Sequence, residues 1–181
     1  MLYPSAIFGI TGSSLTLTAA AQKIFGSHSL FDHYASVGNT STSETDLYSD
    51  TIAASQFAAN GDKIEAEYGG SFVSSATATR QVKIYFAGTA IFDTGALTLS
   101  LSSAWVVFVS IIRVSATVIR YAVSFATQGA ALAAYTSVGE LTGLTLSGTN
   151  ILKITGTAAG VGAATNDIVA KLGSVAFKSA A

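Results

Sequence analysis

The sequence predicts an all-β protein, a two-sheet antiparallel sandwich of the jelly-roll type with an irregular N-terminal arm. Proline occurs once, and the 17 glycines are scattered between short apolar runs, which is typical of many turns and few helices. In several of these runs apolar and polar residues alternate, as in a strand with one buried face. About eight such segments can be counted, the number expected of a sandwich or jelly roll. Only residues 18–25 and 130–135 have a composition that favours a helical turn.

The clearest alternation lies in residues 62–68. Ile64, Ala66 and Tyr68 share one face there, and the charged residues between them share the other. This pattern predicts a strand with one face in the core and one in water. Strands are predicted in the same way over residues 80–86, 97–102 and 117–127, and further strands at 46–52, 150–157 and 167–178.

The segment 105–114 is predicted to be a strand that is apolar on both faces, which a strand with one wet face would not need. Either the N-terminal segment folds over its second face, or that face lies in an oligomer interface. Its alternating sets are Val107, Val109 and Ile111 on one side and Val106, Phe108 and Ile112 on the other. We take the set Val107, Val109 and Ile111 as the candidate oligomer interface.

Charge is scarce: only 10% of the residues are charged and the net charge is -1. No basic surface for nucleic acid or an anionic membrane is therefore expected. An uncharged surface resists association poorly, which favours a protein that is packed against partners. The longest apolar run, residues 104–112, is about half of the roughly 20 residues that a membrane helix needs. The first residues lack the basic and apolar regions of a signal peptide, so we expect synthesis in the cytoplasm.

Residues 1–44 are predicted to form an N-terminal arm with a polar linker, and residues 45–181 the jelly-roll domain. Periodicity fails in the arm, and residues 38–43 are almost entirely small or polar. The arm nevertheless has too many large apolar residues for a disordered tail, so it should dock on this domain or on a neighbouring subunit. We expect that the domain folds from Thr45 onward without it. The candidate docking residues are Ile7, Phe8, Ile10, Ile24, Phe25, Leu30 and Phe31.

No catalytic, cofactor-binding or metal-binding site is predicted. The histidines, His28 and His33, lie five residues apart with Asp32 beside the second, but the chain has no cysteine and no third histidine to complete a metal site. A serine hydrolase is not expected, because no nucleophile elbow is present and no serine of the predicted sandwich has a histidine in the same segment. The protein is therefore expected not to be an enzyme.

A glycine pattern and two carboxylate pairs are better explained by their place in the fold than by nucleotide binding or catalysis. Residues 160–165 approach a dinucleotide-binding glycine pattern, but neither a parallel βαβ unit nor a ribose-binding acid follows. They are interpreted as a strand connection. Asp46 with Asp50, or Glu65 with Glu67, has a spacing compatible with a glycosidase pair. Such carboxylates are more common as solubilising charge on a wet strand face.

Residues 39–52, followed by Phe57 and by residues 59–64, resemble a segment of jelly-roll virion proteins of tailed bacteriophages. There a polar Thr/Ser run leads into a first strand, and an Asn-Gly-Asp turn opens the next. Asn60 and Gly61 suit such a turn, and Phe57 can cap the end of a sandwich. The resemblance continues to about residue 128.

The resemblance implies a homotrimeric structural protein of the virion. The role it favours is a capsid decoration or cement protein on the capsid surface, which bridges subunits of the major capsid protein. The alternative is a head or tail fibre module that binds host surface glycan through an exposed aromatic pocket. Its available aromatics are Tyr68, Tyr85, Trp105 and Tyr121. Neither role implies a cofactor, nucleic acid or a membrane.

Overall fold

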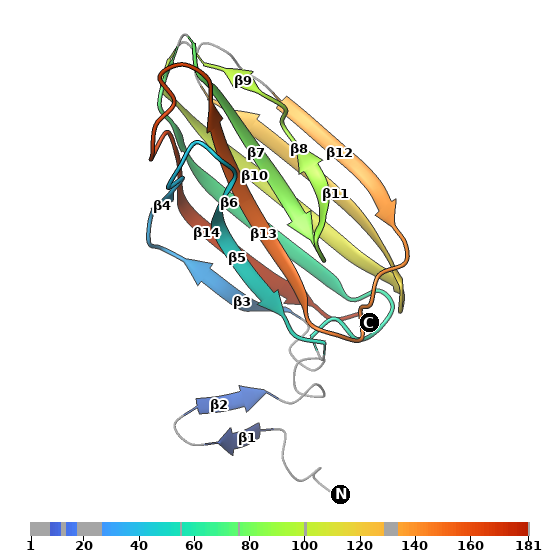
Figure 1. Ribbon diagram of the computed structural model, residues 1–181. Helices are drawn as coiled ribbons and strands as arrows, with labels where there is room; N and C mark the ends of the chain where they lie inside the picture. Colours follow the sequence, from blue (N-terminus) through green and yellow to red (C-terminus); the bar gives the residue numbers. More distant parts are fainter. Residues whose placement is uncertain are drawn as a thin grey trace, which may run out of the picture.

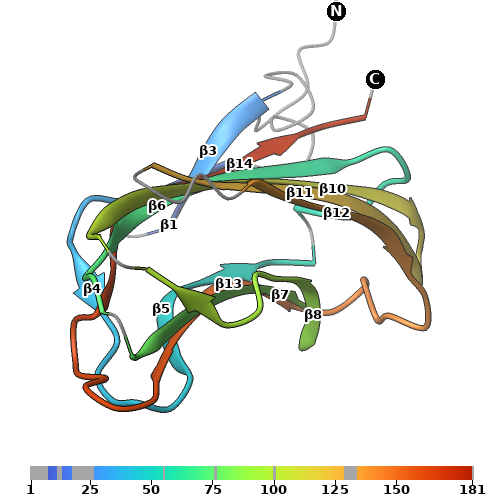
Figure 2. The same cartoon turned by 90° about the horizontal axis from the view of Figure 1, so that it is seen from above.

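The computed structural model shows two β-sheets packed face to face (Figures 1 and 2). It describes residues 8–11, 14–17, 27–54, 56–75, 77–99, 101–128 and 134–180. All regular secondary structure in these ranges is strand. The two layers lie one above the other in Figure 2, and the core lies between them.

The larger sheet has seven strands in the order β12-β11-β10-β6-β14-β3, with β4 also paired to β14. Neighbouring strands are antiparallel throughout. The members are β3 (Ser27–His33), β4 (Val37–Gly38), β6 (Lys63–Phe72), β10 (Ser103–Ser115), β11 (Val118–Thr127), β12 (Ala134–Leu141) and β14 (Ile168–Lys178).

The smaller sheet has five strands in the order β5-β13-β7-β8, with β9 also paired to β7. Its members are β5 (Thr45–Ile52), β7 (Thr79–Phe86), β8 (Thr89–Asp93), β9 (Leu97–Thr98) and β13 (Asn150–Ala159). A separate hairpin is formed by β1 (Phe8–Thr11) and β2 (Ser14–Leu17).

The strand order is that of a jelly roll, which confirms the predicted fold class. The chain passes from β3 in the larger sheet to β5 in the smaller, back to β6, and on to β7 and β8. It then returns to β10, crosses to β13 and ends in β14. The row β3-β14-β6-β10 therefore faces the row β5-β13-β7-β8, as in a jelly roll. The hairpin β11–β12 is inserted after β10 and widens the larger sheet.

The predicted domain boundary at Thr45 is wrong, because β3 and β4 belong to the sandwich. β3 is the edge strand beside β14, and without it the jelly roll lacks its first strand. Leu30 and Phe31 consequently pack against this chain's own core, not outside it. The register shifts between Val175 and Ala176, so Leu30 has no partner opposite it. This bulge interrupts the alternation by which a strand is recognised in sequence. Of the other arm residues, Phe8 and Ile10 lie in β1, and Ile7, Ile24 and Phe25 lie outside the described residues.

The predicted interface set is also wrong: Val107, Val109 and Ile111 lie in the core and are at most 3% exposed. They are on the face of β10 that looks toward the smaller sheet. The alternate residues Phe108 and Ile112 are 49% and 40% exposed. Both sets are apolar, so alternation alone could not say which faced inward.

Other strand predictions are largely confirmed, including the buried face of Ile64, Ala66 and Tyr68 in β6. Among the described residues of 97–102, however, only Leu97 and Thr98 pair as a strand. Strands β8 and β12 were not predicted. Of the two helix candidates, residues 134 and 135 lie in β12, and 18–25 and 130–133 are outside the described residues. No residue of β12 is fully buried, and Ala134, Gly139 and Glu140 are of types depleted in strands, which gives a weak strand signal.

Two features anticipated from the resemblance are present at one end of the sandwich. Gly61 has φ +89°, which suits a residue without a Cβ, and its amide donates to Arg113 O over 2.8 Å. Phe57 is 1% exposed and meets the Phe86 ring edge-on. The guanidinium of Arg113 donates to Phe57 O over 2.6 Å, which holds the loop against the sheet.

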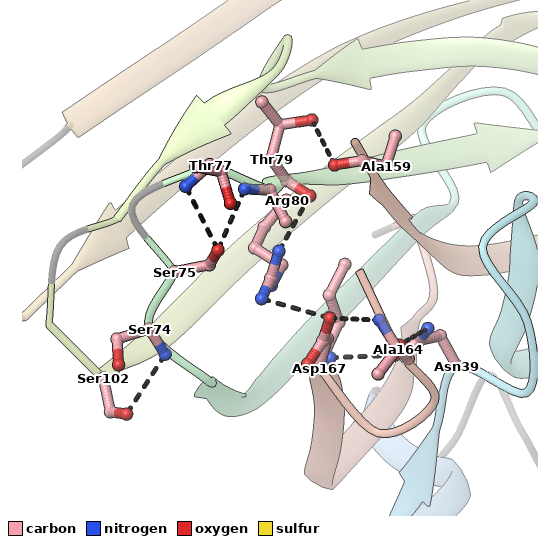
Figure 3. A network of polar contacts seen from close by, with 12 residues as sticks. Asn39, Ser74, Ser75, Thr77, Thr79, Arg80, Ser102, Ala159, Ala164 and Asp167 are labelled. Atoms are coloured by element: carbon pink, nitrogen blue, oxygen red, sulfur yellow. Dashed lines mark hydrogen bonds and ion pairs between the residues drawn. The ribbon is translucent and has the colours of Figure 1, made fainter. Parts of the chain in front are cut away.

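A buried ion pair joins the two sheets near the start of β14 (Figure 3). Arg80 of β7 is 1% exposed, and its guanidinium lies 3.1 Å from Asp167 Oδ2. Asp167 Oδ2 also accepts a hydrogen bond from the Ala164 amide over 2.7 Å. Arg80 donates in addition to Thr79 O. The pair thus connects the smaller sheet with the loop that leads into β14.

Asn39 binds the same loop from the N-terminal side, as Figure 3 shows for its contact with Ala164. Its side-chain amide donates to Ala164 O over 2.9 Å and to Ser41 O over 2.8 Å. Its side-chain oxygen accepts from the Ile168 amide over 2.9 Å. Asn39 is fully buried, so residues just before β5 are part of the folded domain.

The Arg80 to Ala substitution should destabilise the protein by about 3–5 kcal/mol, because it leaves the Asp167 carboxylate buried without its charge partner. Urea unfolding of the purified protein measures this loss. The matched control is Arg120 to Ala, because the Arg120 side chain is 69% exposed in its pair with Glu140. That change should cost less than about 1 kcal/mol. Equal losses in the two variants would contradict the role given to Arg80.

Candidate functional site

The outer face of the larger sheet carries exposed apolar side chains. Val138 is 81% exposed, Leu172 50%, Phe108 49% and Ile112 40%. They come from β12, β14 and β10. Val138, Phe108 and Ile112 alternate with buried or half-buried neighbours on their own strands, and Leu172 follows a register shift in β14. These four residues define what we call the outer apolar face.

Small side chains separate the large ones on this face. In the register, Phe108 lies between Ser124 of β11 and Glu67 of β6. The next row places Ser110 between Ala122 and Glu65. The result is a shallow groove of about 580 Å³ across the sheet. Its lining includes Phe108, Ser110, Ala122, Ser124, Thr136, Val138, Ser174 and Ala176, and Glu65 and Glu67 of β6 lie within it, between β10 and β14.

Charges at one end of this face are paired with each other. Arg120 Nε donates to Glu140 Oε2 over 3.0 Å, and Glu65 binds both Lys63 and Lys178. Hydrogen bonds from Lys178 and Lys63 hold the pKa of Glu65 below its usual value. The groove beside these pairs is lined mainly by uncharged residues. The exception is Glu67, which is exposed and has no salt-bridge partner among the described residues, so a partner on this surface must pair this carboxylate or leave it in water.

A buried polar cluster ties β3 to β5 and β6 at the other side of the sandwich. His33 Nε2 lies 2.8 Å from Asp50 Oδ1, and the Tyr68 hydroxyl donates to Asp50 Oδ2 over 3.1 Å. Asp50 is 2% exposed. Burial raises the pKa of its carboxyl, although His33 and Tyr68 partly offset this. Burial and the Asp50 charge also raise the pKa of Tyr68 well above its usual value.

A hollow of about 280 Å³ lies in front of this cluster. Its lining is Asp32, His33, Tyr34, Ala35, Val37 and Tyr48. The Tyr48 ring is stacked on the His33 ring with 4.2 Å between centroids. Its hydroxyl donates to Ala35 O over 2.7 Å. The two rings therefore form a fixed wall, which sequence reasoning missed because they come from two strands, β3 and β5, that lie in different sheets.

The groups considered for chemistry are not brought together. His28 packs beside the Phe177 ring, and Asp32 accepts a hydrogen bond from Ser29. Among the described residues, no group of three or more His, Cys, Asp and Glu side chains is placed to hold a metal ion. Asp46 is exposed and paired with Lys153, whereas Asp50 points inward, so these carboxylates do not share a face.

Residues 160–165 lie in the connection between β13 and β14, as interpreted from sequence. Gly160 and Gly162 both have positive φ there. In the part of the chain that the structure describes, no helix is long and apolar enough to span a membrane.

The aromatics expected for a glycan pocket are not exposed. Tyr68 and Trp105 are buried in the core, and Tyr85 and Tyr121 are half-buried. Trp105 packs across β6 at Gly70, where a Cβ atom would lie only 2.5 Å from Trp105 Cζ2. Tyr34, which was not among the candidates, is instead 92% exposed.

Two virus structures are similar to this chain in fold. One is the infectious bursal disease virus VP2 subviral particle, with a TM-score of 0.33, 12% identity, and coverage of 83% of this chain and 31% of that chain. The other is the infectious bursal disease virus Gt strain, with a TM-score of 0.36, 11% identity, and coverage of 97% and 38%. This chain thus spans about a third of the length of each. No family model and no curated protein matches the sequence.

The Asp50 to Asn substitution should change how stability depends on pH. Burial raises the folded-state pKa of Asp50 above its ordinary value of 3.8. The stability that the protonated Asp50 contributes is therefore fully present below pH 3.8 and is lost as the pH rises through the raised pKa. The asparagine side chain of the variant does not ionise, so the variant does not lose stability in this way. It should therefore gain stability relative to the parent protein as the pH rises above 3.8.

Urea unfolding at several pH values measures this relative gain. Asp46 to Asn is the matched control, since the Asp46 side chain is 52% exposed and pairs at the surface with Lys153. Its difference from the parent should vary less with pH. If the difference in unfolding free energy between the Asp50 variant and the parent does not change with pH, ionisation of the buried Asp50 carboxylate does not destabilise the fold.

Proposed function

We propose that this protein is a structural virion protein of a tailed bacteriophage, a homotrimeric capsid decoration protein that bridges major capsid subunits. The observation that carries the proposal is the outer apolar face on a chain with few charges. The resemblance of residues 39–128 to phage virion proteins gives the class of assembly. The role requires neither a catalytic group nor a cofactor.

Burial of the outer apolar face supplies a driving force for association. Each large side chain contributes roughly 1.5 kcal/mol when it is fully buried, so four contribute on the order of 6 kcal/mol per face. Lost translational and rotational freedom costs about 4–15 kcal/mol, so one such contact is weak by itself. A closed trimer gives each copy two subunit contacts, and the capsid adds a third surface. Assembly as a trimer on a capsid is therefore favoured over association of two subunits in solution.

The N-terminal hairpin is assigned to capsid docking. β1 and β2 pair only with each other among the described strands. Their register sets Phe8 opposite Leu17 and Ile10 opposite Leu15, and the pairs between are small or polar. An isolated two-stranded hairpin is marginally stable in water, so this one needs a further surface. The major capsid protein is the partner that we propose for it.

The proposed trimer predicts a mass in solution three times that of the 18.4 kDa chain, measured by light scattering at micromolar concentration. Phe108 to Ser should weaken association by about tenfold or more, because an apolar contact is lost. The control is Val161 to Ser, since Val161 is 80% exposed in the β13–β14 connection, away from the outer apolar face. A monomer mass for the parent protein would contradict the proposed association, and a dimer mass would contradict the trimer.

The docking role predicts that a chain beginning at Ser27 folds and forms trimers but binds decoration-free heads poorly. It keeps β3 to β14, including the Asn39 contacts and the outer apolar face. Counting bound copies per head, with the full chain as control, measures the difference. Full occupancy by the shortened chain would mean that the sandwich is the anchor.

Copy number separates decoration from the alternative fibre role. A decoration protein should copurify with DNA-filled heads at a stoichiometry close to that of the major capsid protein. A fibre module should occur in a few copies per particle. Quantitative gel densitometry of purified virions distinguishes the two, and a low copy number would overturn the decoration role.

A further inference from the structure

Tyr34 is an exposed aromatic ring at the rim of a preformed hollow. It follows β3 directly, is 92% exposed and lines the 280 Å³ hollow together with Asp32, His33 and Tyr48. Neither the core nor the outer apolar face uses it. A tyrosine ring in water beside a concave surface is a common way to present contact area at low entropic cost.

The back wall of this hollow is held in place from inside the sandwich. Asp50 fixes His33 Nε2, and the Tyr68 hydroxyl binds the other oxygen of the same carboxylate. Tyr48 stacks on His33 with an interplanar angle of 8°. The imidazole is thus oriented by two strands of the larger sheet and one of the smaller. A ligand at this wall would not have to order it, which lowers the cost of binding.

The rim adds a carboxylate. Asp32 accepts one hydrogen bond, from Ser29 Oγ to its Oδ2 over 2.9 Å. An ionised carboxylate has about four acceptor positions, so this group can accept further donors. The hollow therefore combines one free ring face, one exposed carboxylate and one oriented imidazole.

We propose that this hollow binds a saccharide, with one sugar ring seated against Tyr34. The C–H face of a pyranose is apolar and can stack on an aromatic ring. Its neighbouring hydroxyls donate to a carboxylate and exchange hydrogen bonds with an imidazole. Ligand pockets for drug-sized molecules begin near about 300 Å³, so a hollow of 280 Å³ suits one ring.

An organic cation fits the same residues less well. Recognition of quaternary ammonium groups uses a cage of several aromatic faces. Here Tyr48 is 6% exposed, and one face of its ring is taken by His33. Tyr34 alone presents an open ring, so stacking of a sugar is favoured over enclosure of a cation.

The test is binding of the full-length protein to a printed array of microbial and mammalian glycans. Tyr34 to Ala should lower the signal of the bound glycans at least tenfold, whereas Tyr34 to Phe, which keeps the ring, should retain it. Asp32 to Asn should weaken binding by removing the charged acceptor. Val161 to Ala is the matched control for loss of an exposed apolar side chain and should bind as the parent does.

Absence of any glycan signal that depends on Tyr34 would overturn the proposal. So would Tyr34-dependent binding of tetramethylammonium, followed by NMR shifts of residues 32–37, in the absence of glycan binding. The same variants should keep their mass in light scattering and their occupancy on heads, because Tyr34 is outside the outer apolar face. Failure of the saccharide site is thereby distinguishable from failure of the decoration role.

Discussion

The buried pair of Arg80 and Asp167 is the constraint on which the relation of the two sheets depends. A guanidinium at 1% exposure must keep its partner, since an unpaired charge at this depth is strongly destabilising. Asp167 immediately precedes β14, which lies between β6 and β3 in the larger sheet, and Arg80 belongs to β7 in the smaller. Asn39 binds the same loop and so adds the chain before β5 to this junction. One polar network thereby sets where three separate parts of the chain meet.

A second polar contact between the sheets lies at the first jelly-roll strand. The Asp50 carboxylate of β5 receives Tyr68 from β6 and faces His33 from β3. Around β10 and β11, by contrast, the sheets are joined by apolar side chains such as Val107, Val109 and Phe125. Polar contacts specify geometry because each group has few acceptable partners, whereas apolar contacts supply most of the burial. In this jelly roll, polar contacts fix how the two sheets are placed, and apolar contacts supply most of the buried area.

The inserted hairpin β11–β12 links the fold to the proposed function. It extends the larger sheet beyond the jelly-roll row and carries Val138. Its inner side still contacts the smaller sheet, where Ser137 donates to Ile91 O over 3.0 Å. The outer side has no equivalent cover among the described strands. An insertion of this kind adds a surface for association without changing the order of the jelly-roll strands.

Much of the fold followed from local pattern. Strict alternation in residues 62–68 and 117–127 identified β6 and β11 with their buried faces, because a strand that faces water on one side must alternate. The turn at Gly61 and the cap at Phe57 were also anticipated. Strands β3 and β12 escaped notice because they lie at the two edges of the larger sheet. An edge strand with a bulge or with small residues has a weaker period.

Tertiary structure alone decided which apolar face of β10 is buried and which residues meet at the hollow beside Tyr34. Two apolar sets on one strand are equivalent in sequence, and only the position of the smaller sheet distinguishes Val107 from Phe108. Likewise His33 and Asp50 are 17 residues apart, and the crossing from β3 to β5 brings them within 2.8 Å. Composition and alternation determined the class of fold, since they report how each strand meets water. The sites depend on contacts between strands in different sheets, which no local pattern encodes.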